Sequence, residues 1–433
     1  SIVGVRRLLS MGEATVQTTP CCILDDDGKC VARLFVTKVW TGSSDDACEG
    51  ARGRLLETES VLLDFHLVLQ RVRGYRKDFR RIARKFEEAG LTVGPWQETF
   101  EHILTAAGKQ PGAYSAKPSY QFKAGMRADE ATKKILRSTL AVIRANEEGI
   151  KADWDIEFLH DFRTAVRRTR SALNQIPKVF PPDVTERYKE AFAELGARTN
   201  QLRDLDVYLL AESEYRAMLP EALRDSISPL FDYMRAQRSQ AWHDVVAHLN
   251  STAYAAIVAD WATYLSEPAP EQPAAPNAAM PIDKLARRRI AKQYRRVIND
   301  GDRILDSDED ELVHQLRIDC KKLRYLLEFF AALFPKKKID KLIKQLKILQ
   351  DELGVFNDLS VQQVYLLKTA EVLPSDDPQA KLGLVAVGSL IEKLANEQQA
   401  MKPGLAEAFS TFAAPPNRAL FRQLLGDKGG RKD

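Results

Sequence analysis

Cysteine is scarce in this chain, and long hydrophobic runs are absent from it. The 433 residues include 5 cysteines, an odd number without framework spacing, which favours a reducing compartment over a disulfide-stapled secreted fold. No apolar run approaches the ~18 residues that span a bilayer, and no signal peptide is recognisable. A large excess of one charge is also lacking, because the net charge is only +4. We therefore predict a cytoplasmic globular protein whose partners are indicated by local charge.

Residues 160–170, HDFRTAVRRTR, concentrate positive charge on an element that also has an apolar side. At 100° per residue, Arg163, Arg167 and Arg170 fall within about 80° of His160, on one side of it. Phe162 and its apolar neighbours lie on another face. Taken alone, such a pattern is typical of a solvated face on an amphipathic helix.

A second copy of this pattern changes the interpretation. Residues 314–324, HQLRIDCKKLR, repeat the order of basic residues at a constant offset of 154. The same offset carries Asp204 in RDLDVY onto Asp358 in NDLSVQ. A repeat that extends beyond one helix indicates an internal duplication of a helical unit.

From residue 128 onward the hydrophobic periodicity is almost entirely helical. Four principal helices per copy, with short connections, predict an antiparallel bundle. The predicted fold class is mainly α, with two pseudo-twofold-related four-helix bundles at residues 128–266 and 282–425. A proline- and alanine-rich linker, residues 267–281, is expected between them. The predicted helices lie near 129–150, 155–176, 184–219, 221–249 and up to 265, then near 283–305, 309–334, 338–371, 376–412 and 416–425.

Residues 1–127 differ in kind and predict a small β-rich segment followed by a helical connector. Two strands are expected around Asp27-Gly28, because Asp-Gly is a strong hairpin signal. SVLLDFHLVLQRV, residues 60–72, is a third candidate strand, although its apolar run is ambiguous. A helix is expected over YRKDFRRIARKFEEAG, ending at Gly90.

The paired motifs FLHDFRTAVRRTRSAL and LVHQLRIDCKKLRYLLEFF, each followed by a DL helix, resemble the two halves of a CHAD domain. This family is a histidine-containing α-helical domain that binds inorganic polyphosphate in a basic cavity between two four-helix units. The resemblance covers residues 128–425 and implies binding without catalysis, with targeting or scaffolding at polyphosphate granules. No cofactor is implied. The implied polyphosphate ligands are His160, Arg163, Arg167, Arg168, Arg170, His314, Arg317, Lys321, Lys322 and Arg324, with Lys134, Arg137, Arg288 and Arg295 from the first helix of each copy.

The N-terminal segment carries a weaker resemblance. VGVRRLL, DDGKCVARLFV and VRGYRKDFRRI are similar to the later part of a CYTH domain, the triphosphate tunnel fold often fused ahead of CHAD. The E-x-E-x-K stretch that supplies metal-binding carboxylates and a phosphate-binding lysine in that family is missing. The chain also begins at Ser1 as though upstream strands were absent. No closed tunnel is therefore expected.

The two matched histidines raise the question of a metal. They could meet across the pseudo-twofold axis, yet no carboxylate or cysteine lies at a convincing ligand spacing beside either, and the arginines oppose a cation. We favour phosphate contact or helix anchoring for them. Asp204 and Asp358 are expected to orient basic side chains or to cap a turn. Arg203 has no basic counterpart, since Asn357 takes its place, and its role is open.

Other functions stay open at this point. A CYTH-type triphosphate hydrolase would need the missing acidic strand. Nucleic acid is also a polyanion, but the basic stripes are not interleaved with exposed aromatic residues that stack bases. A structural adaptor at granules is a third alternative. Non-catalytic polyphosphate binding is the function that the sequence favours.

Overall fold

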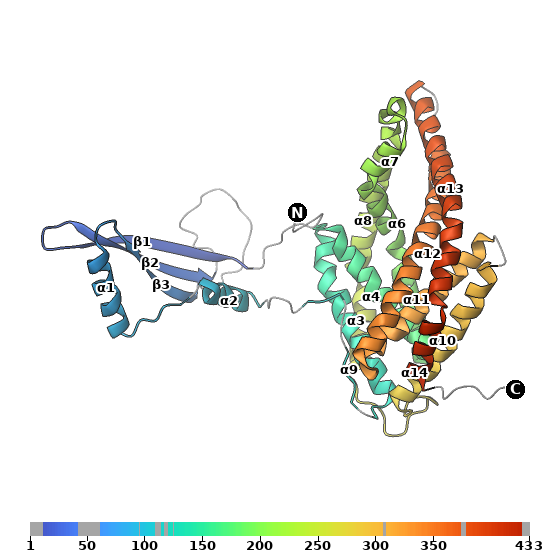
Figure 1. The fold of residues 1–433 in the computed structure, drawn as a ribbon, viewed down its shortest axis with the longest axis horizontal. Helices are drawn as coiled ribbons and strands as arrows, with labels where there is room; N and C mark the ends of the chain where they lie inside the picture. Colours follow the sequence, from blue (N-terminus) through green and yellow to red (C-terminus); the bar gives the residue numbers. More distant parts are fainter. Residues whose placement is uncertain are drawn as a thin grey trace. The chain divides into compact units, whose positions relative to one another are not determined.

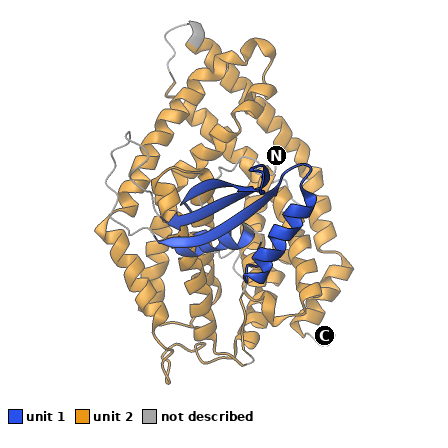
Figure 2. Cartoon of the chain, turned by 90° about the vertical axis from the view of Figure 1, so that its left-hand side faces the viewer, with its two compact units in different colours: residues 1–115 blue, residues 116–433 orange. Residues whose placement is uncertain are grey.

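The computed structural model (Figure 1) describes residues 12–41, 61–94, 96–108, 114–116, 120–123, 125–305, 309–373 and 378–426. The chain divides into two units, Ser1–Ser115 and Ala116–Asp433, coloured separately in Figure 2. The division falls within the segment predicted as a connector.

The first unit contains an antiparallel sheet in the order β1-β2-β3. Its strands are β1 (Ala14–Leu24), β2 (Cys30–Thr41) and β3 (Leu62–Arg71). The turn between β1 and β2 forms because the Asp25 carboxylate accepts the backbone N–H of Lys29 at 2.8 Å, while Gly28 adopts a φ of +75°. The predicted hairpin and the third strand are both confirmed.

Two helices accompany this sheet. They are α1 (Arg76–Glu88) and α2 (Trp96–Ala106). α1 stops where predicted, because Gly90 takes a φ of +86°, a backbone conformation that favours glycine. Buried residues of the sheet are concentrated on the central strand, where Val31, Ala32 and Val39 are almost fully covered.

The second unit is helical, which confirms the mainly α fold class. Its first part consists of α3 (Ala128–Lys151), α4 (Ile156–Gln175), α5 (Pro182–Arg198), α6 (Asn200–Leu210), α7 (Glu212–Met218), α8 (Ser228–Leu249) and α9 (Thr252–Ser266). Its second part consists of α10 (Ile282–Leu305), α11 (Asp310–Phe329), α12 (Lys336–Ala370), α13 (Pro378–Phe412) and α14 (Pro415–Leu425).

The helix bounds follow the sequence repeat in the first two helices of each part. α3 and α10 are both 24 residues long, α4 and α11 are both 20, and each pair begins 154 residues apart. The start of α4 is set by Asp155, whose side chain accepts the Glu157 N–H at 2.8 Å. The pseudo-twofold relation between the two parts stays a prediction.

The prediction of one continuous helix over 184–219 is wrong, because this segment forms three helices, α5, α6 and α7. At the first break, Arg163 donates to the Gly196 carbonyl at 3.1 Å and to the Thr199 hydroxyl at 2.8 Å. In a continuous helix the Gly196 carbonyl would accept the N–H of Asn200. The Thr199 hydroxyl also donates to the Gly196 carbonyl, at 3.1 Å, so a local contact and a contact from the basic stripe meet at the break.

The helix predicted over 221–249 begins later, at Ser228, after two short 3₁₀ turns. Pro229 explains the shift, because proline lacks the N–H that a helix interior needs and fits only its first turn.

The proline-rich segment 267–281 is held against the helices at several points. Asn277 donates its backbone N–H to the Lys178 carbonyl and its side-chain amide to the Pro177 carbonyl, both at 2.8 Å. Ala275 and Ala278 are buried. Apolar residues from both helical parts belong to one continuous core. The role of 267–281 as a boundary between two bundles stays a prediction.

Candidate anion-binding site

Helices α4 and α11, which carry the two repeated motifs, pack against each other in the second unit (Figure 1). An ion pair joins them, since Arg168 of α4 lies 3.1 Å from the Glu328 carboxylate of α11. The two basic stripes also approach each other, because the charge of Arg167 on α4 acts on Arg317 and Lys321 of α11.

The first stripe is anchored by Arg163. Besides its two contacts at the α5–α6 break, its guanidinium donates to the Asn200 side-chain oxygen at 2.8 Å. Burial, together with the charges of Arg167 and Arg203 and against the opposing effect of Asp204, lowers the pKa of Arg163 to about 10. Arg163 therefore braces the site, while the exposed Arg167 is left to face the second stripe.

The second stripe contributes Arg317 and Lys321. Arg317 donates to the Asp358 carboxylate at 3.0 Å, which fulfils the orienting role expected of that residue. Burial, followed by the charges of Arg317 and Arg167, lowers the pKa of Lys321 to about 8. Among the described residues no hydrogen bond to the Lys321 ammonium is found. A half-buried ammonium thus lies between cations from both helices.

The two histidines have matched partners but opposite hydrogen-bond roles. His160 Nδ1 lies 3.1 Å from the Arg203 guanidinium, and His314 Nδ1 lies 2.5 Å from the Asn357 side-chain oxygen. Because a guanidinium only donates, His160 Nδ1 must accept, whereas His314 Nδ1 donates to an amide oxygen. Burial and then the charge of Arg203 lower the pKa of His160. His160 is therefore held neutral, and Arg203 acquires a role as its partner.

The aspartates of the DL motifs face this group of cations. Burial raises the pKa of Asp204, and the nearby charges of Arg163 and Arg203 oppose that rise while Asp358 adds to it. Close by, Tyr208 of α6 stacks on Tyr365 of α12, with ring centroids 4.3 Å apart. The helices that carry the two DL motifs, α6 and α12, are therefore also in contact. We call His160, Arg163, Arg167, Arg203, Asp204, His314, Arg317, Lys321 and Asp358 the convergence site.

Several predicted ligands have their charged groups engaged elsewhere. Lys322 binds the Asp319 carboxylate at 3.0 Å, and Lys134 and Arg137 donate to the backbone carbonyls of Gln121 and Leu265. Arg324 lies 3.5 Å from Glu328 on its own helix. The remaining predicted ligands are placed as follows: Arg168 pairs with Glu328, Arg170 lies over Gly196, and Arg288 and Arg295 line a separate pocket.

Sequence reasoning missed the residues that position the stripe. Thr199 and Asn200 hold Arg163, and nothing in their identity marks them. The matched positions of Arg203 and Asn357 were visible in the sequence, each 43 residues after its histidine, but their shared role as histidine partners was not.

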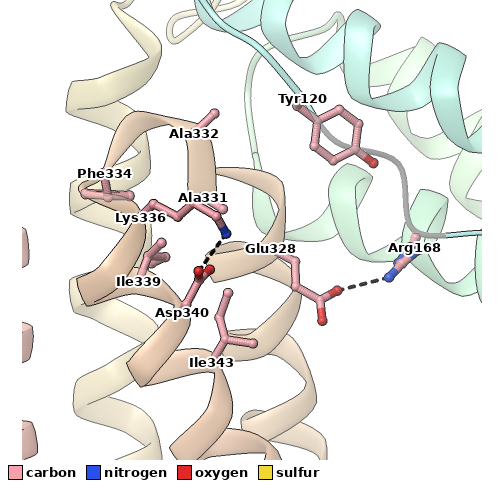
Figure 3. Close-up of a pocket in the computed structure, with 10 residues that line it drawn as sticks. All are labelled: Tyr120, Arg168, Glu328, Ala331, Ala332, Phe334, Lys336, Ile339, Asp340 and Ile343. Atoms are coloured by element: carbon pink, nitrogen blue, oxygen red, sulfur yellow. Dashed lines mark hydrogen bonds and ion pairs between the residues drawn. The ribbon is translucent and has the colours of Figure 1, made fainter.

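A cavity of about 500 Å³ lies beside the convergence site, at α11 and α12 (Figure 3). Phe334, Ile339 and Ile343 provide an apolar wall. Arg168 and Glu328 form its charged side, where the ion pair between α4 and α11 is visible. The cavity is thus a product of helix packing that exposes little unpaired charge.

Membrane-spanning helices and metal-binding clusters are both absent from the described residues. No helix there is long and apolar enough to cross a membrane. In the same part of the chain, no group of three or more histidine, cysteine, aspartate or glutamate side chains is arranged to hold a metal ion.

Comparison with known proteins places these helices among relatives. The family model described as "CHAD domain" matches residues 134–367, more than half of the chain. The crystal structure of the CHAD domain from the plant Ricinus communis is 26% identical, with a TM-score of 0.56, covering 68% of this chain and 96% of that one. PptA from Streptomyces chartreusis is 17% identical with a TM-score of 0.52, covering 67% of this chain and 100% of that one, and shows the fold alone.

Two uncharacterized proteins of Mycobacterium tuberculosis, from two strains, are each 25% identical over 226 residues, or 52% of this chain. The chain spans less than half the length of these curated relatives, since the match covers 42% of each. The matched family region begins after residue 127, and the CYTH-like resemblance of the N-terminal segment stays a prediction.

Proposed function

Given that the chain belongs to the CHAD domain family, we propose that it binds inorganic polyphosphate at the convergence site. The observation that carries the proposal is the meeting of Arg167 from α4 with Arg317 and Lys321 from α11. Besides burial, the charge of Arg167 helps to lower the pKa of both Arg317 and Lys321, and an anion between such cations is favoured because it offsets their repulsion and their burial.

Polyphosphate matches the convergence site in two ways: it is negatively charged, and its phosphate units repeat along the length of the basic stripe. The basic stripe from His160 to Arg170 extends about 15 Å at 1.5 Å per residue, enough for several phosphate units. Guanidinium groups offer paired donors to phosphate oxygens, whereas a lysine offers a mobile point charge. We expect binding that tolerates sliding of the chain, because these contacts require no single register.

Arg167→Glu is the sharpest test of the site. Arg167 is exposed and donates no hydrogen bond within the described residues, so its replacement leaves the helix contacts intact. Arg163 is less suitable because it braces the α5–α6 break. We expect Arg167→Glu to weaken binding of long polyphosphate at least tenfold by calorimetry, with an unchanged circular dichroism spectrum.

The matched control is Arg84→Glu, the same charge change at an exposed position of α1 in the first unit. It should alter the affinity less than twofold. Equal affinity of Arg167→Glu and the unchanged protein would refute the proposed site. Duplex DNA is the competitor of choice, and displacement of polyphosphate by DNA at equal phosphate concentration would favour nucleic-acid binding instead.

We further propose that binding proceeds without hydrolysis. The two aspartates of the convergence site face guanidinium groups, which compete with a metal ion for their oxygens. No phosphate release from polyphosphate or triphosphate is expected with magnesium or manganese. Metal-dependent release that persists after stringent purification, and that Asp358→Asn abolishes, would overturn this part of the proposal.

Targeting or scaffolding at polyphosphate-containing granules is the cellular role that such binding would serve. The test is co-localisation of the tagged protein with stained polyphosphate in cells. Arg167→Glu should disperse the tagged protein, whereas Arg84→Glu should not.

A further inference from the structure

A second basic pocket lies between α10 and α14, with a volume of about 410 Å³. Arg287, Arg288 and Arg295 line it from α10, and Arg422 lines it from α14. The three α10 residues share one face of the helix, because positions seven or eight apart return to nearly the same direction. No residue of the convergence site borders this pocket.

The charge of this pocket is uncompensated by its surroundings. Its lining contains no carboxylate, and none of its four arginines forms an ion pair within the described part of the chain. Arg238 of the same unit shows the contrast, because it binds both Asp153 and Asp206. Four guanidinium groups around one pocket repel one another unless an anion of several charges lies between them.

The floor of the pocket is rigid and carries one polar group. Tyr294 stacks on Phe421, with ring centroids 3.8 Å apart, which fixes α10 against α14. Arg287 is also held, since it donates to the Leu424 carbonyl and lies 5.1 Å from the centre of the Phe334 ring. The Tyr294 hydroxyl is buried and has no hydrogen-bond partner among the described residues. The hydroxyl oxygen exposes almost no surface, so it lies enclosed by protein atoms beneath the pocket.

We propose that this pocket is a second anion site, which takes a compact and multiply charged phosphate group such as a triphosphate. The arginines supply paired donors to the phosphate oxygens. The volume lies in the range of small-molecule sites, about 300–1,000 Å³. The group can be free tripolyphosphate or the triphosphate of a nucleotide, whose base would contact Ala291 and Leu425.

This site is independent of the proposed binding of long polyphosphate. Arg288 and Arg295, predicted from the sequence as ligands of one shared cavity, are assigned here to a different ligand. Failure of either proposal therefore leaves the other standing.

The test is calorimetric titration of the full chain with tripolyphosphate and with ATP, without metal. Arg295→Glu should weaken binding of the tighter ligand at least tenfold, because the guanidinium is replaced by a repelling carboxylate. Lys292→Glu is the matched control, since Lys292 is an exposed cation of the same helix outside the pocket, and it should change the affinity less than twofold. Tighter binding of ATP identifies a nucleotide, and equal binding identifies the phosphate group alone.

Absence of binding by both ligands would overturn the proposal. So would an equal loss in Arg295→Glu and Lys292→Glu, or abolition of triphosphate binding by Arg167→Glu.

Discussion

The unusual state of Lys321 makes polyphosphate binding depend on pH in a defined direction. Its pKa is lowered to about 8, first by burial and then by the charges of Arg317 and Arg167. A phosphate chain placed among these groups favours the protonated ammonium and raises that pKa. Binding then takes up a proton above pH 8, and the affinity falls as the pH rises.

The magnitude follows from the protonated fraction. With a pKa of about 8, Lys321 is about 90% protonated at pH 7 and about 10% at pH 9. If only the charged form binds well, the affinity falls about tenfold over this interval, or about 1.4 kcal/mol. Long polyphosphate is the suitable ligand for this measurement, because its internal phosphates stay ionised between pH 7 and pH 9. The change of affinity with pH then comes from the protein.

Lys321→Met is the decisive variant, since it keeps a flexible stem of similar size and removes the charge. It should bind more than tenfold more weakly than the unchanged protein at pH 7, remain the weaker binder at pH 9, where about 10% of Lys321 is still protonated, and show no slope between them. The stability of the free protein provides a second check. Between pH 8 and the ordinary lysine pKa of 10.5 the unfolded state binds more protons, so stability rises with pH there, and Lys321→Met should lose that rise. An identical pH slope in both proteins would refute the reasoning.

Three further expectations concern stability and the ligand. Arg168→Ala removes the ion pair with Glu328 between α4 and α11 and should lower the free energy of unfolding by ~1.5–3 kcal/mol in urea titrations; no change would mean that the pair is solvent-screened. Gly301→Ala should destabilise by ~1–3 kcal/mol or more, because its Cβ would lie 1.8 Å from the Phe409 ring, whereas Gly354→Ala, with nothing within 4 Å, should be neutral or slightly stabilising. Long polyphosphate should bind the convergence site far more tightly than triphosphate and with a steep salt dependence, and a flat salt response would contradict phosphate contacts.

The helices that carry the motifs could be predicted closely, because their signals are local. α4 begins and ends within one residue of the predicted 155–176. α11 begins one residue after the predicted start at 309, but it ends at Phe329, before the predicted end at 334. Apolar spacing and end signals such as Asp155 are short-range features that a sequence displays directly. The contact of Arg163 with the Gly196 carbonyl at the break between α5 and α6 could not be predicted, because the two residues are 33 positions apart.

Periodicity and residue order are properties of the chain alone, and they indicate the mainly α fold, the repeat of 154 residues and the two histidine-led basic stripes. Which cations remain available depends on how the helices pack. Arg168 and Lys322 occupy matched positions and look equivalent to Arg167 and Lys321 in the sequence, yet both are neutralised by carboxylates, of Glu328 and Asp319. Helical neighbours point in directions about 100° apart, so packing turns one toward a partner and leaves the next among other cations. Charge can be counted along a sequence, but its compensation depends on distances across the fold.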